Sequence, residues 1–298
     1  MSLPGRDLHV RPPPRSIAAR CHSTCATRLA TTKFLVCNDR GGIRMKNVAK
    51  RKLQSGQSIV GAFVAFPHPD MCDWLAHMGF DWLILDMEHG PLSFEMVQRM
   101  IQAMKGTDCA PLVRPPTNND ADIKRILDLG AFGIVAPMVN TRNDAERAVR
   151  ACHYPPRGIR GYGPRRPLKI DLEYLATVED ELLIMALIET EQGVLNAEDI
   201  LSVPGIDAGV IGPFDLSFDM GFGTPLKWDE PRYAGAFARL VKAAQNTGKA
   251  AGTVTNELDR IPWLIEMGHR AILVGEADAF LLRGAQMALD AGRGQQSR

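Results

Sequence analysis

Apolar residues recur along the chain in short runs, and each run is followed by a segment with helical periodicity. The runs have the length of buried strands and are rich in Val, Ile, Leu and Ala. The segments between them repeat apolar residues every three or four positions, as at 94–104, 123–129, 143–152, 233–245 and 262–267. The runs themselves cover residues 58–66, 82–87, 111–114, 133–139, 182–188, 208–212, 250–254 and 271–275. The pattern therefore predicts eight strand–helix units.

Eight such units in about 230 residues match the size of a (β/α)8 TIM barrel, an α/β fold with an outer ring of helices. Gly79, Gly130 and Gly268 follow predicted helices, where a glycine commonly ends a helix. The alternative is a doubly wound open sheet, which needs a glycine-rich turn after its first strand. This chain reads PHP there, at residues 67–69. We therefore expect one barrel domain over residues 45–298.

Residues 1–44 differ from the rest of the chain in composition. They hold eight Arg or Lys against two acidic residues, a run of three prolines and no sustained apolar period. An organelle transit segment has this kind of composition, and so does a disordered extension or sequence upstream of the natural start. Met45 opens a segment that reads like a natural start leading into a helix. We expect residues 1–44 to be a disordered or targeting-like extension.

Charge and cysteine content narrow the class of protein. The chain of 298 residues has a formal net charge of +1, and its basic excess lies in residues 1–44, so the predicted barrel is mildly acidic. This balance gives no case for nucleic-acid binding, and no apolar stretch is long enough for a membrane helix. The six cysteines form no CxxC pair, as in proteins of reducing compartments. A cytoplasmic enzyme is expected, or a mitochondrial one if residues 1–44 are a transit segment.

Charged side chains stand at the carboxyl ends of the predicted strands, where TIM barrels place their chemistry. Asp86 and His89 follow the second run, and Arg114 ends the third. Glu189 and Asp215 follow the fifth and sixth runs. Because these strands are neighbours in a barrel, the side chains are expected to converge on one site.

The residue types at these strand ends are chemically coherent. Glu189 and Asp215 offer hard oxygen ligands for Mg²⁺ or Mn²⁺. Arg114 offers a planar fork of donors for a carboxylate or a developing enolate. His89 is a candidate general base, and Asp86 could orient it.

Each of these residues also has a structural interpretation. Arg114 could pair with Asp86 or Glu88, and Glu88 is expected to form such an ion pair. The carboxylates could be solvated or cap helices, and His89 could be a loop residue. Among the other candidates, we expect His153 on a loop surface, His269 at a helix dipole, and the basic loop 154–166 over the barrel mouth.

The strand ends carry motifs that resemble those of the HpcH/HpaI aldolase family. The motifs are DMEHG at 86–90, LVRP at 112–115, YPPRGIRG at 154–161, IET at 188–190 and IGPFDLS at 211–217. The similarity runs over residues 47–290 in the right order and spacing. Members of this family include 2,4-dihydroxyhept-2-ene-1,7-dioate aldolase and 2-keto-3-deoxy sugar-acid aldolases.

The resemblance implies a class II pyruvate aldolase on a (β/α)8 barrel of the phosphoenolpyruvate/pyruvate type. It further implies a homohexamer in which a C-terminal helix is exchanged between barrels. Glu189 and Asp215 would bind a divalent metal, Mg²⁺ or Mn²⁺ with Co²⁺ as a further option. Arg114 would stabilise the pyruvate enolate, and His89 would act as base with Asp86 as its partner. Backbone groups from Gly212 to Asp215, including Phe214, would hold the substrate carboxylate.

The predicted reaction is cleavage of a 4-hydroxy-2-oxo acid to pyruvate and an aldehyde through a metal-stabilised enolate. The alternative is oxaloacetate decarboxylation or a related C–C lyase step on the same metal site. A third possibility is a non-catalytic barrel that binds a small acid. Met87 and Phe214 stand where many relatives carry smaller residues, so we expect a narrowed site for the aldehyde.

Overall fold

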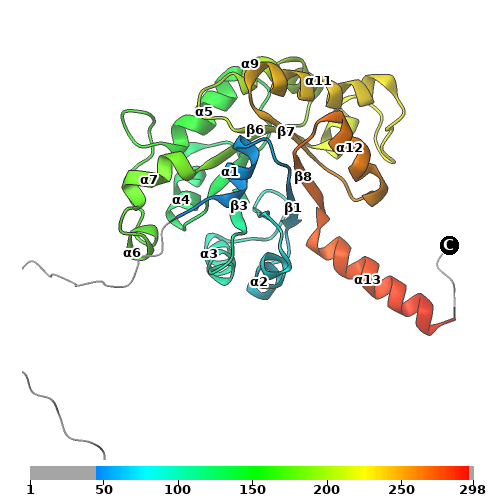
Figure 1. The fold of residues 1–298 in the computed structure, drawn as a ribbon, viewed down its shortest axis with the longest axis horizontal. Coiled ribbons are helices and arrows are strands. Elements are labelled where there is room, and N and C mark those ends of the chain that lie inside the picture. Colours follow the sequence, from blue (N-terminus) through cyan, green and yellow to red (C-terminus); the bar gives the residue numbers. More distant parts are fainter. Residues whose placement is uncertain (1–44, 295–298) are drawn as a thin grey trace, which may run out of the picture. The chain divides into compact units, whose positions relative to one another are not determined.

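The predicted barrel is present in the computed structural model, which describes residues 45–294. Eight parallel strands pair in chain order, and β8 closes on β1 (Figure 1). The expectation for residues 1–44 lies outside the described residues. All eight predicted runs are strands: β1 Ile59–Val64, β2 Trp82–Asp86, β3 Ala110–Arg114, β4 Gly133–Ala136, β5 Leu183–Ile188, β6 Ala208–Ile211, β7 Ala250–Val254 and β8 Ala271–Glu276.

Helices follow the strands and cover the outside of the barrel (Figure 1). The sequence marks their ends: Ser93, Asn119 and Thr141 cap helix N-termini with their side chains, and Gly79 and Gly268 end helices in left-handed conformation. No helix among residues 45–294 combines the length and apolarity that a membrane span needs. The helices are α1 Val48–Gln54, α2 Pro69–Met78, α3 Phe94–Ala103, α4 Asp120–Asp128, α5 Arg142–Cys152, α6 Pro167–Ile170, α7 Tyr174–Glu181, α8 Glu191–Leu195, α9 Ala197–Leu201, α10 Pro213–Asp219, α11 Pro231–Thr247, the 3-10 turn η1 Leu258–Arg260, α12 Ile261–Met267 and α13 Ala277–Gly292.

Two hydrophobic clusters hold the barrel together. One fills its interior with strand residues such as Trp82, Leu112 and Met185, and Ala49 and Leu53 of α1 join this cluster. The other lies between the strands and the surrounding helices. Because α1 leads directly into the amino end of β1, it packs at the amino end of the barrel. The candidate site residues lie at the opposite, carboxyl end. The amino end is therefore closed by apolar packing, and the carboxyl end is left for chemistry.

Three expectations for histidines and loops are wrong. His153 is buried, and its Nδ1 lies 2.8 Å from the carbonyl oxygen of Val149. His269 is also buried, and burial lowers its pKa to about 4, so it is neutral and carries no charge for a helix dipole. The loop 154–166 does not lie over the mouth. It packs at the amino end of the barrel, where Arg160 Nη2 donates to Asp128 Oδ1 at 2.9 Å at the end of α4.

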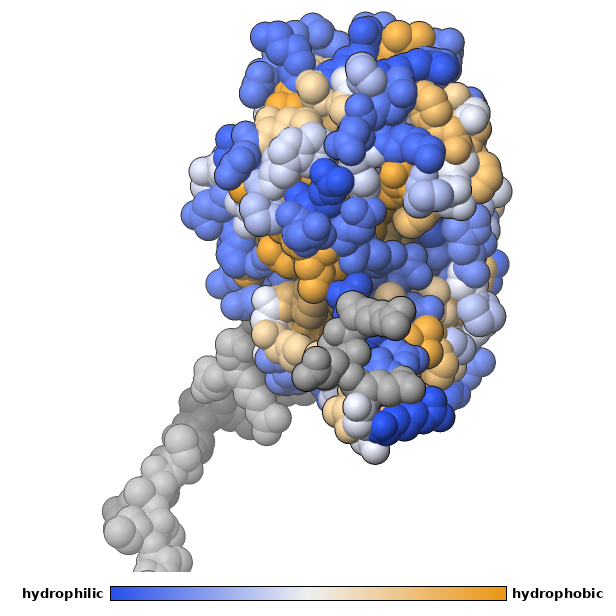
Figure 2. All heavy atoms as spheres, turned by 90° about the vertical axis from the view of Figure 1, so that its right-hand side faces the viewer, coloured by the Kyte–Doolittle hydropathy of each residue, from blue (hydrophilic) through white to orange (hydrophobic). Residues whose placement is uncertain are grey.

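The last helix, α13, extends away from the barrel (Figure 1). Of its residues only Ala277 is buried, although Leu281, Leu282, Met287 and Leu289 are apolar and exposed. Figure 2 views the molecule from the side toward which α13 extends, and apolar patches lie there between polar ones. An amphipathic helix that leaves its apolar residues in solvent lacks a partner surface on its own barrel.

Candidate active site

Asp86 and Arg114 form a buried ion pair at the carboxyl ends of β2 and β3. The two residues are register partners, so the strand pairing itself brings them together. Arg114 Nε donates to Asp86 Oδ1 at 2.8 Å, and Nη2 donates to Oδ2 at 2.7 Å. Asp86 is 3% exposed and Arg114 is 7% exposed. This bidentate geometry fixes the plane of the guanidinium group.

Two further contacts hold Arg114 in place. Its Nη1 lies 3.2 Å from Glu88 Oε2, and its Cζ lies 4.8 Å from the centre of the Phe63 ring. Burial disfavours the charge on Arg114, but Asp86, Glu88 and Glu189 together outweigh it and raise the pKa of Arg114. Burial also raises the pKa of Glu88. The predicted Glu88 ion pair is thus present, and Arg114 is a fixed cation at the mouth.

Asp86 also organises the loop that carries His89. Its Oδ1 accepts from the backbone N–H of Glu88 at 3.1 Å and of His89 at 3.4 Å. The imidazole of His89 is exposed at the mouth. The expected pairing of Asp86 with the imidazole is therefore replaced by pairing with Arg114 and with the backbone at His89.

Glu189 directly follows β5 and is a buried carboxylate, 3% exposed. Its Oε1 accepts from the backbone N–H of Met138 at 2.9 Å, and Met138 adopts the left-handed φ of 51°. Gly212 gives it room, because a Cβ there would lie 3.0 Å from Glu189 Oε2. Burial raises the pKa of Glu189 to about 7, and the neighbouring carboxylates Glu88 and Asp215 add to the rise.

Asp215 lies in the first turn of α10, directly after β6. The Tyr233 hydroxyl donates to the carbonyl oxygen of Pro213 at 2.8 Å and fixes the start of this helix. Asp215 is exposed at the mouth, and its field reaches both Glu189 and Glu88. Phe214 beside it is 40% exposed.

The donor set suits a divalent cation. The charges of Asp86 and Asp215 act on Glu88, and those of Glu88 and Asp215 act on Glu189. Arg114 is the cation near these groups, within the field of Asp86, Glu88 and Glu189. A buried carboxylate with other carboxylates around it is stabilised by a nearby cation. No group of three or more His, Cys, Asp or Glu residues within 45–294 is arranged to enclose an ion. Glu189 and Asp215 offer oxygen ligands of the kind that Mg²⁺ or Mn²⁺ takes, and substrate and water would have to supply the other ligands.

Glu276 is a residue of the mouth that the sequence analysis missed. It ends β8 and pairs in register with Phe63, the residue beneath Arg114. Burial raises its pKa, Asp86 raises it further, and Arg114 and His89 oppose the rise. The signal was available in the sequence, because Glu276 directly follows the eighth predicted run.

Comparison with known proteins identifies the family of this barrel. Residues 60–282 match the model of the HpcH/HpaI aldolase/citrate lyase family. The chain belongs to this family. The resemblance in the strand-end motifs is thereby confirmed, and the protein is a carbon–carbon lyase.

Relatives in this family are similar to this chain over most of their length. A 4-hydroxy-2-oxo-heptane-1,7-dioate aldolase of Salmonella typhimurium is 36% identical over 248 residues, covering 81% of this chain and 93% of that protein. A hydroxypyruvate/pyruvate aldolase of Rhizorhabdus wittichii is 38% identical over 198 residues, covering 66% of this chain and 79% of that protein. The crystal structure of a family protein from Burkholderia cenocepacia superposes with a TM-score of 0.77 at 30% identity, covering 83% of this chain and all of that one.

Proposed function

We propose that this lyase is a class II pyruvate aldolase that cleaves a 4-hydroxy-2-oxo acid to pyruvate and an aldehyde. The observation that carries the proposal is the buried Arg114, held by Asp86 beside the carboxylates Glu189 and Asp215 at the barrel mouth. A 2-oxo acid presents a carboxylate and a keto oxygen, which both attract cations. This site offers one fixed cation, the guanidinium of Arg114, and oxygen ligands that could hold a metal ion as a second cation. The names of the two curated relatives support the same reaction type.

Glu189 and Asp215 would hold the divalent metal, Mg²⁺ or Mn²⁺, with Co²⁺ as a further option. When bound, such a metal supplies Lewis acidity to the keto group of the substrate. The raised pKa of Glu189 supports this assignment, because a buried carboxylate among carboxylates is stabilised by a cation.

Arg114 would stabilise the negative charge that develops on the pyruvate fragment. Its two hydrogen bonds to Asp86 use the N–H of Nε and one N–H of Nη2. The ion pair with Glu88 lies at Nη1, so the second N–H of Nη2 and the N–H groups of Nη1 would be left for a substrate oxygen. Because the guanidinium is already fixed, it needs no reorganisation during the reaction.

His89 would act as the base that removes the proton from the 4-hydroxyl group. Its exposed imidazole lies on the loop that Asp86 holds through two backbone hydrogen bonds. As the proton moves to the imidazole, the C3–C4 bond breaks and the aldehyde leaves. The first-turn N–H groups of Phe214 and Asp215, beside Gly212, would hold the substrate carboxylate.

Pyruvate release from several 4-hydroxy-2-oxo acids tests the reaction. Protein stripped of metal with a chelator should be inactive and should recover with added Mn²⁺. His89→Ala should lower aldol cleavage by about 10²-fold or more and leave oxaloacetate decarboxylation in place. Full activity after chelation, together with a borohydride-trapped lysine adduct, would contradict the proposal.

The assembly belongs to the same proposal. A homohexamer in which α13 packs on a neighbouring barrel would cover the exposed Leu281, Leu282 and Leu289.

The three cysteines among the described residues are buried free thiols, which supports a cytoplasmic location.

A further inference from the structure

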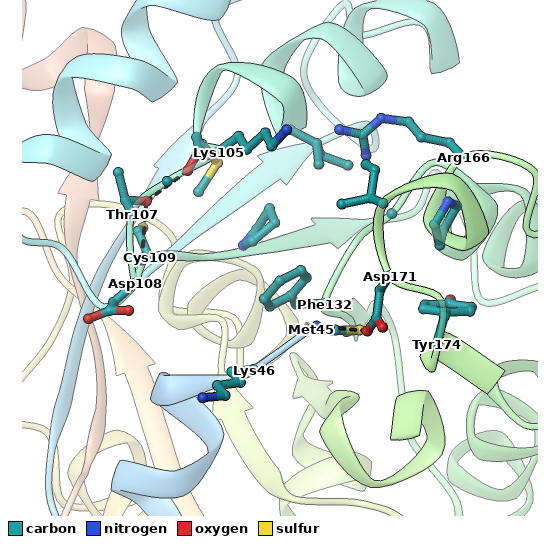
Figure 3. A pocket seen from close by; sticks show the side chains of 17 residues that line it. Met45, Lys46, Lys105, Thr107, Asp108, Cys109, Phe132, Arg166, Asp171 and Tyr174 are labelled. Carbon is teal, nitrogen blue, oxygen red and sulfur yellow. Dashed lines mark hydrogen bonds between the residues drawn. The ribbon is translucent and has the colours of Figure 1, made fainter. Parts of the chain in front are cut away.

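A second cavity lies at the amino end of the barrel, opposite to the proposed active site. It has a volume of about 340 Å³, within the range of small-molecule pockets. Cys109 and Phe132, which precede β3 and β4, form part of its wall together with Met45 ahead of α1 (Figure 3). None of the residues of the proposed active site lines it.

Most of the cavity wall is apolar. It is formed from the segment ahead of α1, from the end of α3 with the segment that leads into β3, from the segment before β4, and from residues 166–174 around α6, so the wall joins four separate parts of the chain. A ligand that fills it would exchange water for carbon contacts, which favours an apolar body. The apolar wall residues include Ile101, Met104, Pro111, Phe132, Pro167 and Ile170.

Cations gather at one edge of this cavity. Figure 3 shows Lys105 and Arg166 extending toward one another across it. Arg166 is half-buried, and its Nη1 donates to the carbonyl oxygen of Leu129 at 2.8 Å. Gly130 makes room for this guanidinium, since a Cβ there would lie 2.5 Å from Nη1.

No acidic side chain within residues 45–294 forms an ion pair with Arg166 or Lys105. The buried acid of the wall, Asp171, is already engaged, because it accepts from the backbone N–H of Met45 at 2.8 Å and of Glu173 at 2.9 Å. The other acid of the wall, Asp108, is exposed beside Cys109, away from Arg166 in Figure 3. A half-buried guanidinium without a counter-ion favours an anion.

We propose that this cavity binds an organic acid with an apolar body, such as an aryl-alkyl carboxylate. The carboxylate pairs with Arg166 and Lys105, and the apolar body lies against Met104 and Phe132. The cavity and the barrel mouth lie at opposite ends of the strands, so the acid would occupy a site separate from the proposed active site.

Titration calorimetry of the full chain with 4-phenylbutyrate tests the proposal, with neutral 4-phenyl-1-butanol as the matched ligand. The acid should bind saturably, and the alcohol should bind about tenfold more weakly, as should the acid to Arg166→Gln. Arg165→Gln is the control variant, because Arg165 is adjacent and exposed but does not line the cavity. It should bind the acid like the parent chain, and so should Glu189→Gln.

The calorimetry would overturn the proposal if it showed no saturable binding, equal binding of acid and alcohol, or equal binding by the parent chain and Arg166→Gln. Circular dichroism checks that Arg166→Gln is folded. If it is not, Lys105→Gln takes its place, and the methyl resonance of Met104 must move when the acid is added to the parent chain. An unmoved Met104 resonance would place the ligand elsewhere. Loss of binding in Glu189→Gln would place it at the barrel mouth.

Discussion

At the scale of one residue, Glu189 shows that burying a carboxylate lowers the stability of a protein when the carboxylate is ionised. In the folded chain, burial raises its pKa from an ordinary 4.5 to about 7. The folded state therefore holds a proton in a pH range where the unfolded chain has released it. The stability that this proton contributes is full below about pH 4.5 and is lost as the pH rises through about 7.

We therefore expect Glu189→Gln to stabilise the metal-free protein by roughly 1–3 kcal/mol near pH 8, since the neutral amide avoids the buried charge. Near pH 4 the gain should vanish. Urea unfolding at both pH values measures it, and Glu266→Gln, at an exposed carboxylate on α12, is the control. Destabilisation at the higher pH would show that the Glu189 carboxylate is already compensated within the chain.

The proposed role of Arg114 depends on the planar shape of its guanidinium group as well as on its charge. A lysine keeps the charge but cannot make the two parallel hydrogen bonds to Asp86. We expect Arg114→Lys to lower kcat of pyruvate release by about 10²-fold or more while the chain stays folded. Arg99→Lys, in an exposed pair with Glu95, should leave kcat unchanged. A kcat near that of the parent chain in Arg114→Lys would mean that a point charge is enough.

At the scale of elements, α13 is the helix whose apolar residues are not covered by its own barrel. Its apolar residues are large and exposed, with Leu282 67% exposed, so an isolated chain would leave them in water. If α13 packs on a neighbouring barrel in the proposed hexamer, Leu281→Glu with Leu282→Glu should dissociate that hexamer into smaller species, as measured by light scattering after gel filtration. Asp290→Lys, which changes the charge of the same helix at a polar position, should keep the assembly. A parent chain that is monomeric at all concentrations would contradict the exchange of α13.

At the scale of the whole molecule, the residues that stabilise the barrel and the residues of the proposed reaction lie in different places. Its interior is filled from the amino end by α1 and strand residues, and the proposed reaction uses only side chains and backbone N–H groups at the carboxyl end. All eight strands and every proposed site residue lie within residues 45–294.

A chain that begins at Met45 is therefore expected to fold and to keep kcat/KM for pyruvate release within about twofold of the full chain. Its melting temperature should stay within roughly 2 °C of the full chain. Calorimetry and the pyruvate assay measure both. Loss of activity in the shorter chain would assign a role to residues 1–44.

The sequence by itself determined the strands and the residues at their ends. Strands covered on both faces must be apolar along their whole length, so the runs and the polar residues that end them are visible without coordinates. Asp86, Arg114, Glu189 and Asp215 were found in this way, and Glu276 could have been found by the same rule.

Only the tertiary structure decided which of these side chains meet. The strand register sets Asp86 opposite Arg114, so its carboxylate pairs there and reaches His89 only through the backbone. The course of the chain after α5 carries loop 154–166 to the amino end, where Arg160 is buried. Such contacts join residues far apart in sequence. They form only when the strands close into a barrel, and a local pattern of residues does not reveal how the strands align on closure.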